Sequence, residues 1–423
     1  MGGLDKMSDL CRIFRETVQS YKELAMKTEK EADVGYSTGF PNFDMRNAAE
    51  VHVYNEEKGL NYKYYMVGLS DGCITTIIGR SGCGKSTWAW QVAANIVRPF
   101  KEGSIFADEI ESGMQDSRKE TLTGFNGAEL KERCIVRNTG ITSQNFFQRI
   151  KLIHDIRVAD PDRYMYDTGY LDYNGNPISK FVPCVYILDS YALLRPAELT
   201  KEEELSGQMS VTSSAKMNTE ILRRITPLIK EANINLFIIN HILQDVQINA
   251  FKPKQQQNRY LKEGERCPGG DTALYLANNL IKLVDLQLDK GYDMDGSKIR
   301  LEILKSRTNK AGKYTFLVYD QATGYDPELS LFESLKEDGV ICAAGAYYSF
   351  KDHPEVTKFK RKEFKEKIRT DADFRQKFMA AAMEYLASMV DKEAQEERES
   401  IQQTISITNE FYNMINYQGA KVA

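Results

Sequence analysis

The sequence predicts an α/β protein whose core is a mostly parallel sheet covered by helices on both faces. First, apolar strands alternate with helical segments over about residues 35–335, which is typical of such a sheet. Second, an apolar strand at 73–78 runs into a glycine-rich loop followed by a helix-forming run. Third, the apolar strands 183–188 and 236–239 both end in polar residues. Ligands bind at this edge of a parallel sheet, so the same observations place a candidate site.

The chain divides into three segments. Residues 1–34 form a predicted N-terminal helical segment, residues 35–335 the α/β core, and residues 336–423 a charged, α-rich C-terminal region. The first segment contains an amphipathic helix over 8–30, which either packs on its own core or contacts a neighbouring subunit. Its apolar residues at helical spacing are Leu10, Ile13, Phe14, Val18, Tyr21 and Leu24.

Composition excludes several classes of protein. A chain of 423 residues with a net charge of −4 suits a soluble protein of about two or three domains. We find neither an apolar run long enough to span a membrane nor the apolar segment of a signal peptide. The seven cysteines include no C-x-x-C pair, which argues against a disulfide framework or a zinc site. We expect a cytoplasmic protein whose charge neither requires nor excludes nucleic acid.

The glycine-rich loop is the most informative motif, because its G-x-x-x-x-G-K-[ST] spacing lies between a strand and a helix, as the motif requires. Successive backbone N–H groups in such a loop converge on an anion, and the helix N-terminus adds positive potential. Lys85 would neutralise the β- and γ-phosphates of ATP, and the Ser86 hydroxyl would bind Mg²⁺. The predicted phosphate-binding residues are Gly79, Arg80, Ser81, Gly82, Cys83, Gly84, Lys85, Ser86 and Thr87.

Three other strand ends add polar groups to this edge. Asp189 is the candidate Mg²⁺ ligand, although Asp at a strand end is also a common cap or turn residue. For His241 we favour a γ-phosphate sensor over a structural histidine. A carboxylate after strand 104–108 would be the general base that activates water. Glu109 and Glu111 both qualify, since alternation points them the same way, and either could instead be a solvated acid.

The order of these motifs resembles the RecA family. Over roughly residues 35–345, the similarity is greatest to UvsX-type recombinases of T-even-like phages. The residues that carry it are Gly-Arg-Ser-Gly-Cys-Gly-Lys-Ser-Thr (79–87), the acidic end of strand 104–108, Ile-Leu-Asp-Ser (187–190), Ile-Ile-Asn-His (238–241), Pro-Gly-Gly-Asp-Thr-Ala-Leu-Tyr-Leu-Ala-Asn (268–278) and Leu-Lys-Ser-Arg-Thr (304–308).

The resemblance implies a RecA-like P-loop ATPase and DNA-binding core over residues 35–335. It implies a DNA-dependent ATPase that uses ATP and Mg²⁺, forms helical filaments on single-stranded DNA and carries out strand exchange in recombination and repair. The implied partners are single-stranded DNA, duplex DNA and further copies of the chain. A single-strand-binding protein and a loading mediator are further candidates, in the cytoplasm of a phage-infected bacterial cell.

Family roles also extend to particular residues. By position, Glu111 matches the catalytic glutamate of the family, which selects it over Glu109. Lys305 and Arg307 match cations that reach the phosphates of an adjoining subunit. Arg118 stands where the family has an aromatic residue that stacks on adenine, so any stacking here would use a guanidinium group.

Two loops are the candidate DNA contacts. In the loop over about 196–214, the resemblance makes Met209 an apolar wedge between bases. The loop over about 243–270 is too long for an ordinary connection, and its spaced cations suit a phosphate backbone. It is otherwise a disordered surface loop. Its candidate DNA-binding residues are Lys252, Lys254 and Arg259.

Three segments depart from the family pattern or lie outside it. Residues 44–70 and 163–181 are insertions, and Asn174-Gly175 predicts a hairpin in the second, whose tyrosines we expect to pack across its strands. Residues 358–367 predict a basic helix with interleaved aromatics, either a solvated face or a second site for duplex DNA.

Two other functions compete with a recombinase. A hexameric helicase could use the same core, but we expect no separate N-terminal scaffold domain of adequate size before the P-loop, since the predicted lead-in is one helix. A filament-forming DNA-binding protein could use ATP as structural glue, but Glu111, Asp189 and His241 form a complete hydrolytic set.

Overall fold

The computed structural model describes residues 34–420 except 112, 199–207, 245–257, 289–291 and 293, and within this range not the side chains of 208–213 and 409–420. The predicted N-terminal helix, Lys252 and Lys254 therefore lie outside the described residues.

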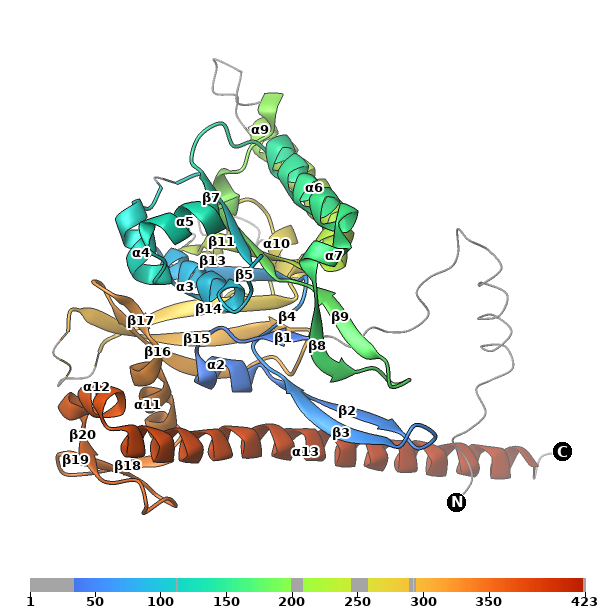
Figure 1. Cartoon of the computed structure of the whole chain (residues 1–423). Helices are drawn as coiled ribbons and strands as arrows, with labels where there is room; N and C mark the ends of the chain where they lie inside the picture. The colour runs from blue at the N-terminus through green and yellow to red at the C-terminus, as the bar shows by residue number, and fades with distance from the viewer. Residues whose placement is uncertain are drawn as a thin grey trace.

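A nine-stranded sheet lies at the centre of the described part of the chain (Figure 1). Six neighbouring strands, β14 to β7 in the order below, are parallel, and three antiparallel strands extend one edge. The mostly parallel sheet is thus confirmed. The spatial order is β17 (Gly324–Asp326), β16 (Tyr314–Asp320), β15 (Gly296–Ser306), β14 (Asn279–Leu286), β5 (Ile74–Gly79), β11 (Ile234–His241), β10 (Cys184–Asp189), β6 (Ser104–Glu109) and β7 (Cys134–Arg137).

Alternation along the central strands divides the apolar core between the two faces of the sheet. In β10, Val185 and Ile187 join the cluster that includes α3, whereas Tyr186 and Leu188 join the cluster that includes α6 and α9. Successive strand residues point to opposite faces, so a strand buried on both faces is apolar throughout. The covering helices are α3 (Lys85–Val97), α4 (Asp116–Thr123), α5 (Gly127–Arg133), α6 (Ser143–Ala159), α7 (Pro161–Tyr164) and α9 (Gln208–Glu231).

The two predicted insertions are hairpins that fold against each other. The first pairs β2 (Ala49–Asn55) with β3 (Leu60–Met66), and the second pairs β8 (Met165–Leu171) with β9 (Pro177–Phe181). The rings of Tyr64 and Tyr170 stack with centroids 4.1 Å apart, and the Tyr62 hydroxyl donates to the Leu171 carbonyl at 2.6 Å. The hairpin at Asn174-Gly175 is confirmed. The tyrosine packing differs from the expectation of contacts across the strands of this hairpin, because Tyr170 stacks on the other hairpin.

The C-terminal region contributes most of an apolar cluster that also includes Met45, Ala48 and Val318 from earlier in the chain. It combines α11 (Pro327–Glu337), α12 (Arg361–Thr370), the start of α13 (Ala372–Ala420) and a three-stranded sheet of β18 (Ile341–Ala344), β19 (Tyr347–Phe350) and β20 (Phe359–Lys360). Phe359 and Phe364, from the predicted basic helix, are both buried. The structure shows the helix from Arg361 onward but corrects its start, because Phe359 lies in a strand, and both rings stabilise the core. The choice between a solvated face and a site for duplex DNA stays a prediction. The boundary at residue 335 stays a prediction.

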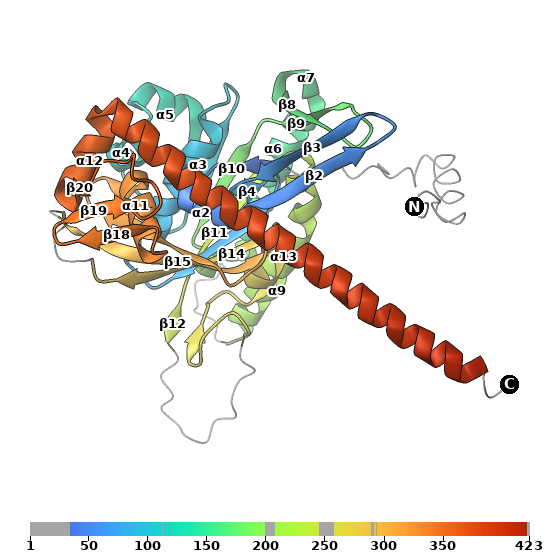
Figure 2. The same cartoon turned by 90° about the horizontal axis from the view of Figure 1, so that it is seen from below.

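Helix α13 contains 49 residues, which corresponds to about 73 Å at the standard rise per residue. Phe378, Leu386 and Val390 anchor its first part in the C-terminal cluster. Figure 2 shows it crossing the molecule and extending beyond the other labelled elements.

Short elements complete the described part of the chain. None of its helices combines the length and hydrophobicity needed to cross a membrane. The short elements are β1 (Gly35–Tyr36), α2 (Pro41–Arg46), β4 (Leu69–Ser70), the 3-10 helix η1 (Tyr191–Leu193), β12 (Leu243–Gln244), β13 (Glu265–Arg266) and α10 (Thr272–Leu276).

Candidate functional site

The glycine-rich loop joins the end of β5 to the start of α3. Gly82 and Gly84 have φ of +80° and +76°, a region that favours glycine. A Cβ on Gly84 would lie 2.6 Å from the Tyr325 hydroxyl. Helix α3 begins without a side-chain cap and without an acidic residue in its first turn. Its first N–H groups are therefore available to an anion.

Lys85 is a buried cation beside this loop. Lys85 is 5% exposed, and its Nζ donates to the Arg80 carbonyl at 2.8 Å. Burial lowers the pKa of Lys85. Among the described residues no carboxylate lies within ion-pair distance of its ammonium group. A buried charge is costly unless it is paired, so the site favours an anionic ligand.

Ser86 and Asp189 lie side by side at the carboxyl ends of the parallel strands. The Ser86 hydroxyl donates to Asp189 Oδ2 at 2.5 Å. Burial raises the pKa of Asp189, and the Ser86 hydrogen bond opposes that change. A hydroxyl and a carboxylate side by side are oxygen ligands of the kind that Mg²⁺ prefers. Both residues therefore fit the predicted metal site.

His241 links Lys85 to Glu111. Its Nδ1 lies 3.4 Å from Lys85 Nζ, and its Nε2 lies 2.8 Å from Glu111 Oε1. Lysine donates and a carboxylate accepts, so this geometry suits the tautomer that has its hydrogen on Nε2 and leaves Nδ1 as an acceptor. The Ser190 hydroxyl also donates to Glu111 Oε1, at 2.8 Å. Burial opposes ionisation of Glu111, but the hydrogen bonds from Ser190 and His241 outweigh it and lower the pKa of this carboxyl.

The two candidate bases occupy different environments. Glu109 is buried, with Oε2 3.1 Å from Lys119 Nζ and Oε1 accepting from Trp90 Nε1 at 3.2 Å. Glu111 points toward the loop and His241. The expectation that both point the same way is wrong, because β6 ends at Glu109 and strand alternation stops there. The geometry thus brings Glu111 to the site and places Glu109 in a structural ion pair.

Arg118 lies in the first turn of α4. Its guanidinium donates to the carbonyl of Ala322, in the turn between β16 and β17. That turn continues to Tyr325, which packs beside the glycine-rich loop. The predicted role of Arg118 at the adenine base stays a prediction.

Tyr325 is a site residue that the sequence reasoning missed. Its hydroxyl donates to the Cys83 carbonyl at 2.9 Å, within the loop. Gln91 of α3 holds the Tyr325 backbone, with its Nε2 donating to the Tyr325 carbonyl at 3.0 Å and its Oε1 accepting from Tyr325 N–H at 2.8 Å. Tyr325 follows a glycine in a three-residue strand. We find no local motif that marks it as a partner of a loop so distant in sequence.

The candidate DNA-binding residues are only partly described. Met209 lies in the first turn of α9, so the predicted loop over 196–214 includes the start of a helix. Its side chain lies outside the described set. Arg259 is exposed, with its guanidinium carbon 4.6 Å from the centroid of the Tyr260 ring. Their contact with DNA stays a prediction.

Lys305 and Arg307 lie at the sheet edge opposite the glycine-rich loop. Lys305 pairs with Leu280 near the start of β14, whereas Gly79 pairs with Leu283 further along that strand. Lys305 Nζ donates to the Tyr275 carbonyl at 2.5 Å. Its pKa is lowered by burial and by the nearby positive charges of Arg307 and Arg259. No carboxylate among the described residues pairs with Lys305 or Arg307. The geometry separates them from the glycine-rich loop of their own chain.

The fold defines the class: a mixed α/β protein with a RecA-like core and a long C-terminal helix. The chain is similar to proteins named Protein RecA from Heliobacterium modesticaldum and Treponema denticola. The first is 25% identical over 171 residues, 40% of this chain and 45% of the relative. The second is 22% identical over 233 residues, 52% of each chain.

A third relative is the mitochondrial DNA repair protein recA homolog of Dictyostelium discoideum. It is 22% identical over 172 residues, 40% of this chain and 34% of the relative. The chain spans about half the length of the first two relatives and a smaller share of the third. No protein-family model matches the chain. These similarities support a relationship to RecA-family recombinases.

Proposed function

We propose that the chain is a DNA-dependent ATPase that acts as a recombinase. It would assemble as a helical filament on single-stranded DNA and carry out strand exchange with duplex DNA. The names of its relatives, RecA and DNA repair protein, support this class of function. The resemblance of its motifs to UvsX-type phage recombinases supports a role in a phage-infected bacterial cell, with a single-strand-binding protein and a loading mediator as partners.

The observation that carries the proposal is the chain of contacts from Lys85 through His241 to Glu111. ATP would place its phosphates at the loop and Lys85. Mg²⁺, held through Ser86 and Asp189, would supply charge neutralisation at the phosphates. Glu111, kept ionised by Ser190 and His241, would accept a proton from the attacking water. His241 would report the state of the phosphate to Glu111, because its ring contacts both sides.

The opposite placement of Lys305 and Arg307 supports a site completed by a second copy. Cations placed away from their own loop would complete the neighbour's site, where charge supplied in trans is worth on the order of 10³-fold or more in rate. In a head-to-tail contact, each subunit is rotated relative to the one before it. When these rotations do not close a ring, the contact repeats along an open helical filament.

A mixing experiment tests this arrangement. Lys85→Ala protein lacks a working loop, and Lys305→Ala/Arg307→Ala protein lacks the cations, so each alone should be inactive. Together they should regain part of the DNA-dependent ATPase activity, since some interfaces join an intact loop to intact cations. A mixture that stays inactive although both variants assemble on the same DNA would overturn the trans arrangement.

Electron microscopy tests the recombinase against the helicase. With single-stranded DNA and a non-hydrolysable ATP analogue, we expect open helical filaments. Closed six-membered rings would favour the helicase. Filaments with normal DNA binding but no ATP hydrolysis would favour a protein that uses ATP as structural glue.

A further inference from the structure

The loop that carries Arg307 is held by helix α13. This loop joins β15 to β16, and its Lys313 forms an ion pair with Glu393 of α13. The side chains of Lys313 and Glu393 are 12% and 35% exposed. At its other side, the Asn309 amide donates to the Ala48 carbonyl just before β2. Partial burial shields the ion pair from solvent screening, so it is stronger than an exposed pair.

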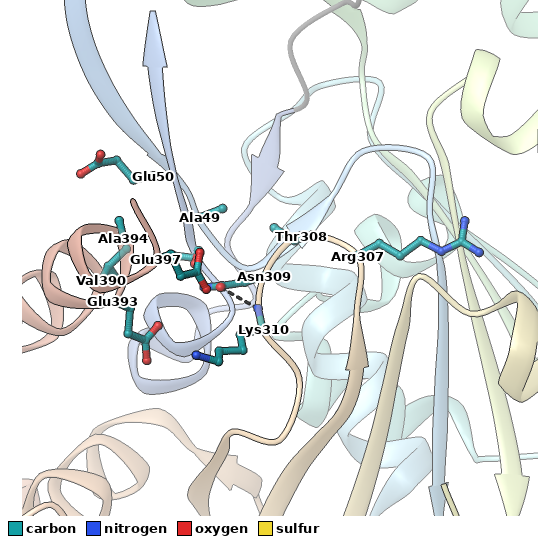
Figure 3. A pocket seen from close by; sticks show the side chains of 11 residues that line it. Ala49, Glu50, Arg307, Thr308, Asn309, Lys310, Val390, Glu393, Ala394 and Glu397 are labelled. Atoms are coloured by element: carbon teal, nitrogen blue, oxygen red, sulfur yellow. Dashed lines mark hydrogen bonds between the residues drawn. The ribbon is translucent and has the colours of Figure 1, made fainter. Parts of the chain in front are cut away.

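An open cavity separates the rest of the loop from α13. It has a volume of about 490 Å³ and is lined by residues 48–50, 307–310 and one face of α13, which includes Glu393 and Glu397. Figure 3 shows Arg307 pointing away from α13, while Lys310 lies on the side of Glu393. Because space lies between them, close packing against α13 does not fix this part of the loop. The position of the loop therefore depends on the polar contacts of Asn309 and Lys313 on either side of the cavity.

Lys313 is directly connected to the strand that carries the cations. Its carbonyl accepts from the N–H of Ile303 at 2.8 Å, and the N–H of Gly312 donates to the Ile303 carbonyl at 2.8 Å. Ile303 lies two residues before Lys305 in β15. A shift of Lys313 would therefore move the strand end that presents Lys305 and Arg307.

Helix α13 is a firm support for this loop. Val390 is buried in the C-terminal cluster. Asp391 accepts from the Tyr65 hydroxyl at 2.6 Å and from Lys63 at 2.9 Å. Five residues beyond Glu393, Arg398 pairs with Glu50 at 2.7 Å. The helix is thus fixed to the β2–β3 hairpin on both sides of Glu393.

We propose that Glu393 is a positioning residue for the ATPase site of a neighbouring subunit. Through Lys313 it holds the β15–β16 loop so that Lys305 and Arg307 reach the neighbour's phosphates. This inference rests on the proposed function. It assigns to the C-terminal helix a role in the chemistry of the next subunit along the assembly.

The mixing experiment described above tests this inference. Glu393→Lys would be introduced either into the Lys85→Ala protein, which supplies the cations, or into the Lys305→Ala/Arg307→Ala protein, which supplies the loop. In the cation donor we expect the recovered ATPase activity to fall by about tenfold, because small misplacements of catalytic groups have effects of this order. In the loop donor we expect the activity to stay unchanged.

Two controls separate positioning from general damage. Glu396→Lys makes the same charge change on α13, where the exposed Glu396 forms, among the described residues, an ion pair with Lys392 alone, at 3.9 Å. It should leave the activity unchanged in either protein. Adding Lys313→Glu to Glu393→Lys restores an ion pair with reversed polarity and should recover most of the activity.

The outcomes distinguish the two proposals. If the unmodified mixture is inactive, the trans arrangement itself fails. If the unmodified mixture is active but Glu393→Lys has the same effect in both proteins, or none in the cation donor, the positioning role is overturned. The positioning role would also be contradicted if the reversed ion pair failed to recover activity although thermal unfolding showed that both variants are folded.

Discussion

At the scale of single residues, Glu111 and Glu109 show how position relative to the end of a strand decides the environment of a carboxylate. Glu109 still belongs to β6 and is neutralised by Lys119, whereas Glu111 lies beyond the strand and reaches His241. A buried paired carboxylate has no proton-transfer partner at the loop. An ionised carboxylate beside a histidine is suited to accept a proton from water.

Substitution of these residues gives a direct prediction. Lys85→Ala should weaken ATP binding and abolish hydrolysis, whereas Glu111→Gln should retain binding and lose hydrolysis. Nucleotide titration and phosphate release measure the two effects separately. As a control, Glu109→Gln should keep the chemistry but reduce stability by about 1–3 kcal/mol, because the buried Lys119 then keeps only Asp116, at 3.6 Å, as a carboxylate partner. Normal hydrolysis by Glu111→Gln would contradict the assignment of the base.

Asp44 provides a prediction about pH. It is buried and accepts hydrogen bonds from Ser37 and Thr38, yet burial dominates and raises its pKa to about 6. Between about pH 4 and pH 6 the folded state then binds a proton that the unfolded chain releases. Protonation of Asp44 therefore contributes about 3 kcal/mol to the free energy of unfolding below about pH 4. This contribution is lost as the pH rises through 6.

The measurement compares urea unfolding of the wild type and of Asp44→Asn across this range. The difference in unfolding free energy should change with pH, since only the wild type carries this titration. A constant difference from pH 4 to pH 7 would mean that the hydrogen bonds to Asp44 offset its burial.

At the scale of elements, the aromatic residues of the basic C-terminal segment belong to a core. Phe364 is fully buried, and its ring lies 5.0 Å from that of Phe378 and 5.1 Å from that of Phe332. Phe364→Ala should therefore lower the free energy of unfolding by about 3–5 kcal/mol. Chemical denaturation measures this change.

The exposed Lys362 is the matched control in the same helix. Lys362→Ala should change stability by less than about 0.5 kcal/mol. If the segment contacts duplex DNA, this variant should bind duplex DNA more weakly while its stability stays unchanged. Loss of stability in Lys362→Ala, or none in Phe364→Ala, would reverse the two roles.

The elements that sequence could predict are those with a strong local pattern. The strands around Val185 and Phe237 are buried on both faces and are therefore continuous apolar runs. The hairpin at Asn174-Gly175 has a turn that requires positive φ. By contrast, β18 to β20 contain four, four and two residues. These strands are too short for a periodic pattern, so their sequence does not predict them.

The candidate site could be predicted only where a motif is local. The glycine-rich loop is one continuous segment, so its residues follow from spacing alone. Tyr325 could not be found in this way, because its partner Cys83 is on a distant segment and only folding brings them together. The ion pair between Lys313 and Glu393 was missed for the same reason.

At the scale of the whole molecule, salt dependence of DNA binding is the test of the proposed interface. Neutralising Lys252, Lys254 and Arg259 together should weaken single-stranded DNA binding with little sequence preference. The slope of log affinity against log salt should fall by about 0.7 for each phosphate that the altered loop no longer neutralises. ATPase activity without DNA should survive, whereas its stimulation by DNA should decrease. Unchanged affinity across the salt series would exclude this loop as the DNA site.

The opposite placement of the phosphate loop and of Lys305 has a consequence for how activity depends on concentration. Under the proposed function, every copy has two unlike ends, as a monomer in a condensation polymer does. In an open assembly, the glycine-rich loop at one end always lacks a neighbour's cations. About half of the ATPase sites are therefore complete in an assembly of two copies, and about nine tenths in an assembly of ten. The turnover per copy should therefore rise with protein concentration even when ATP and DNA are saturating.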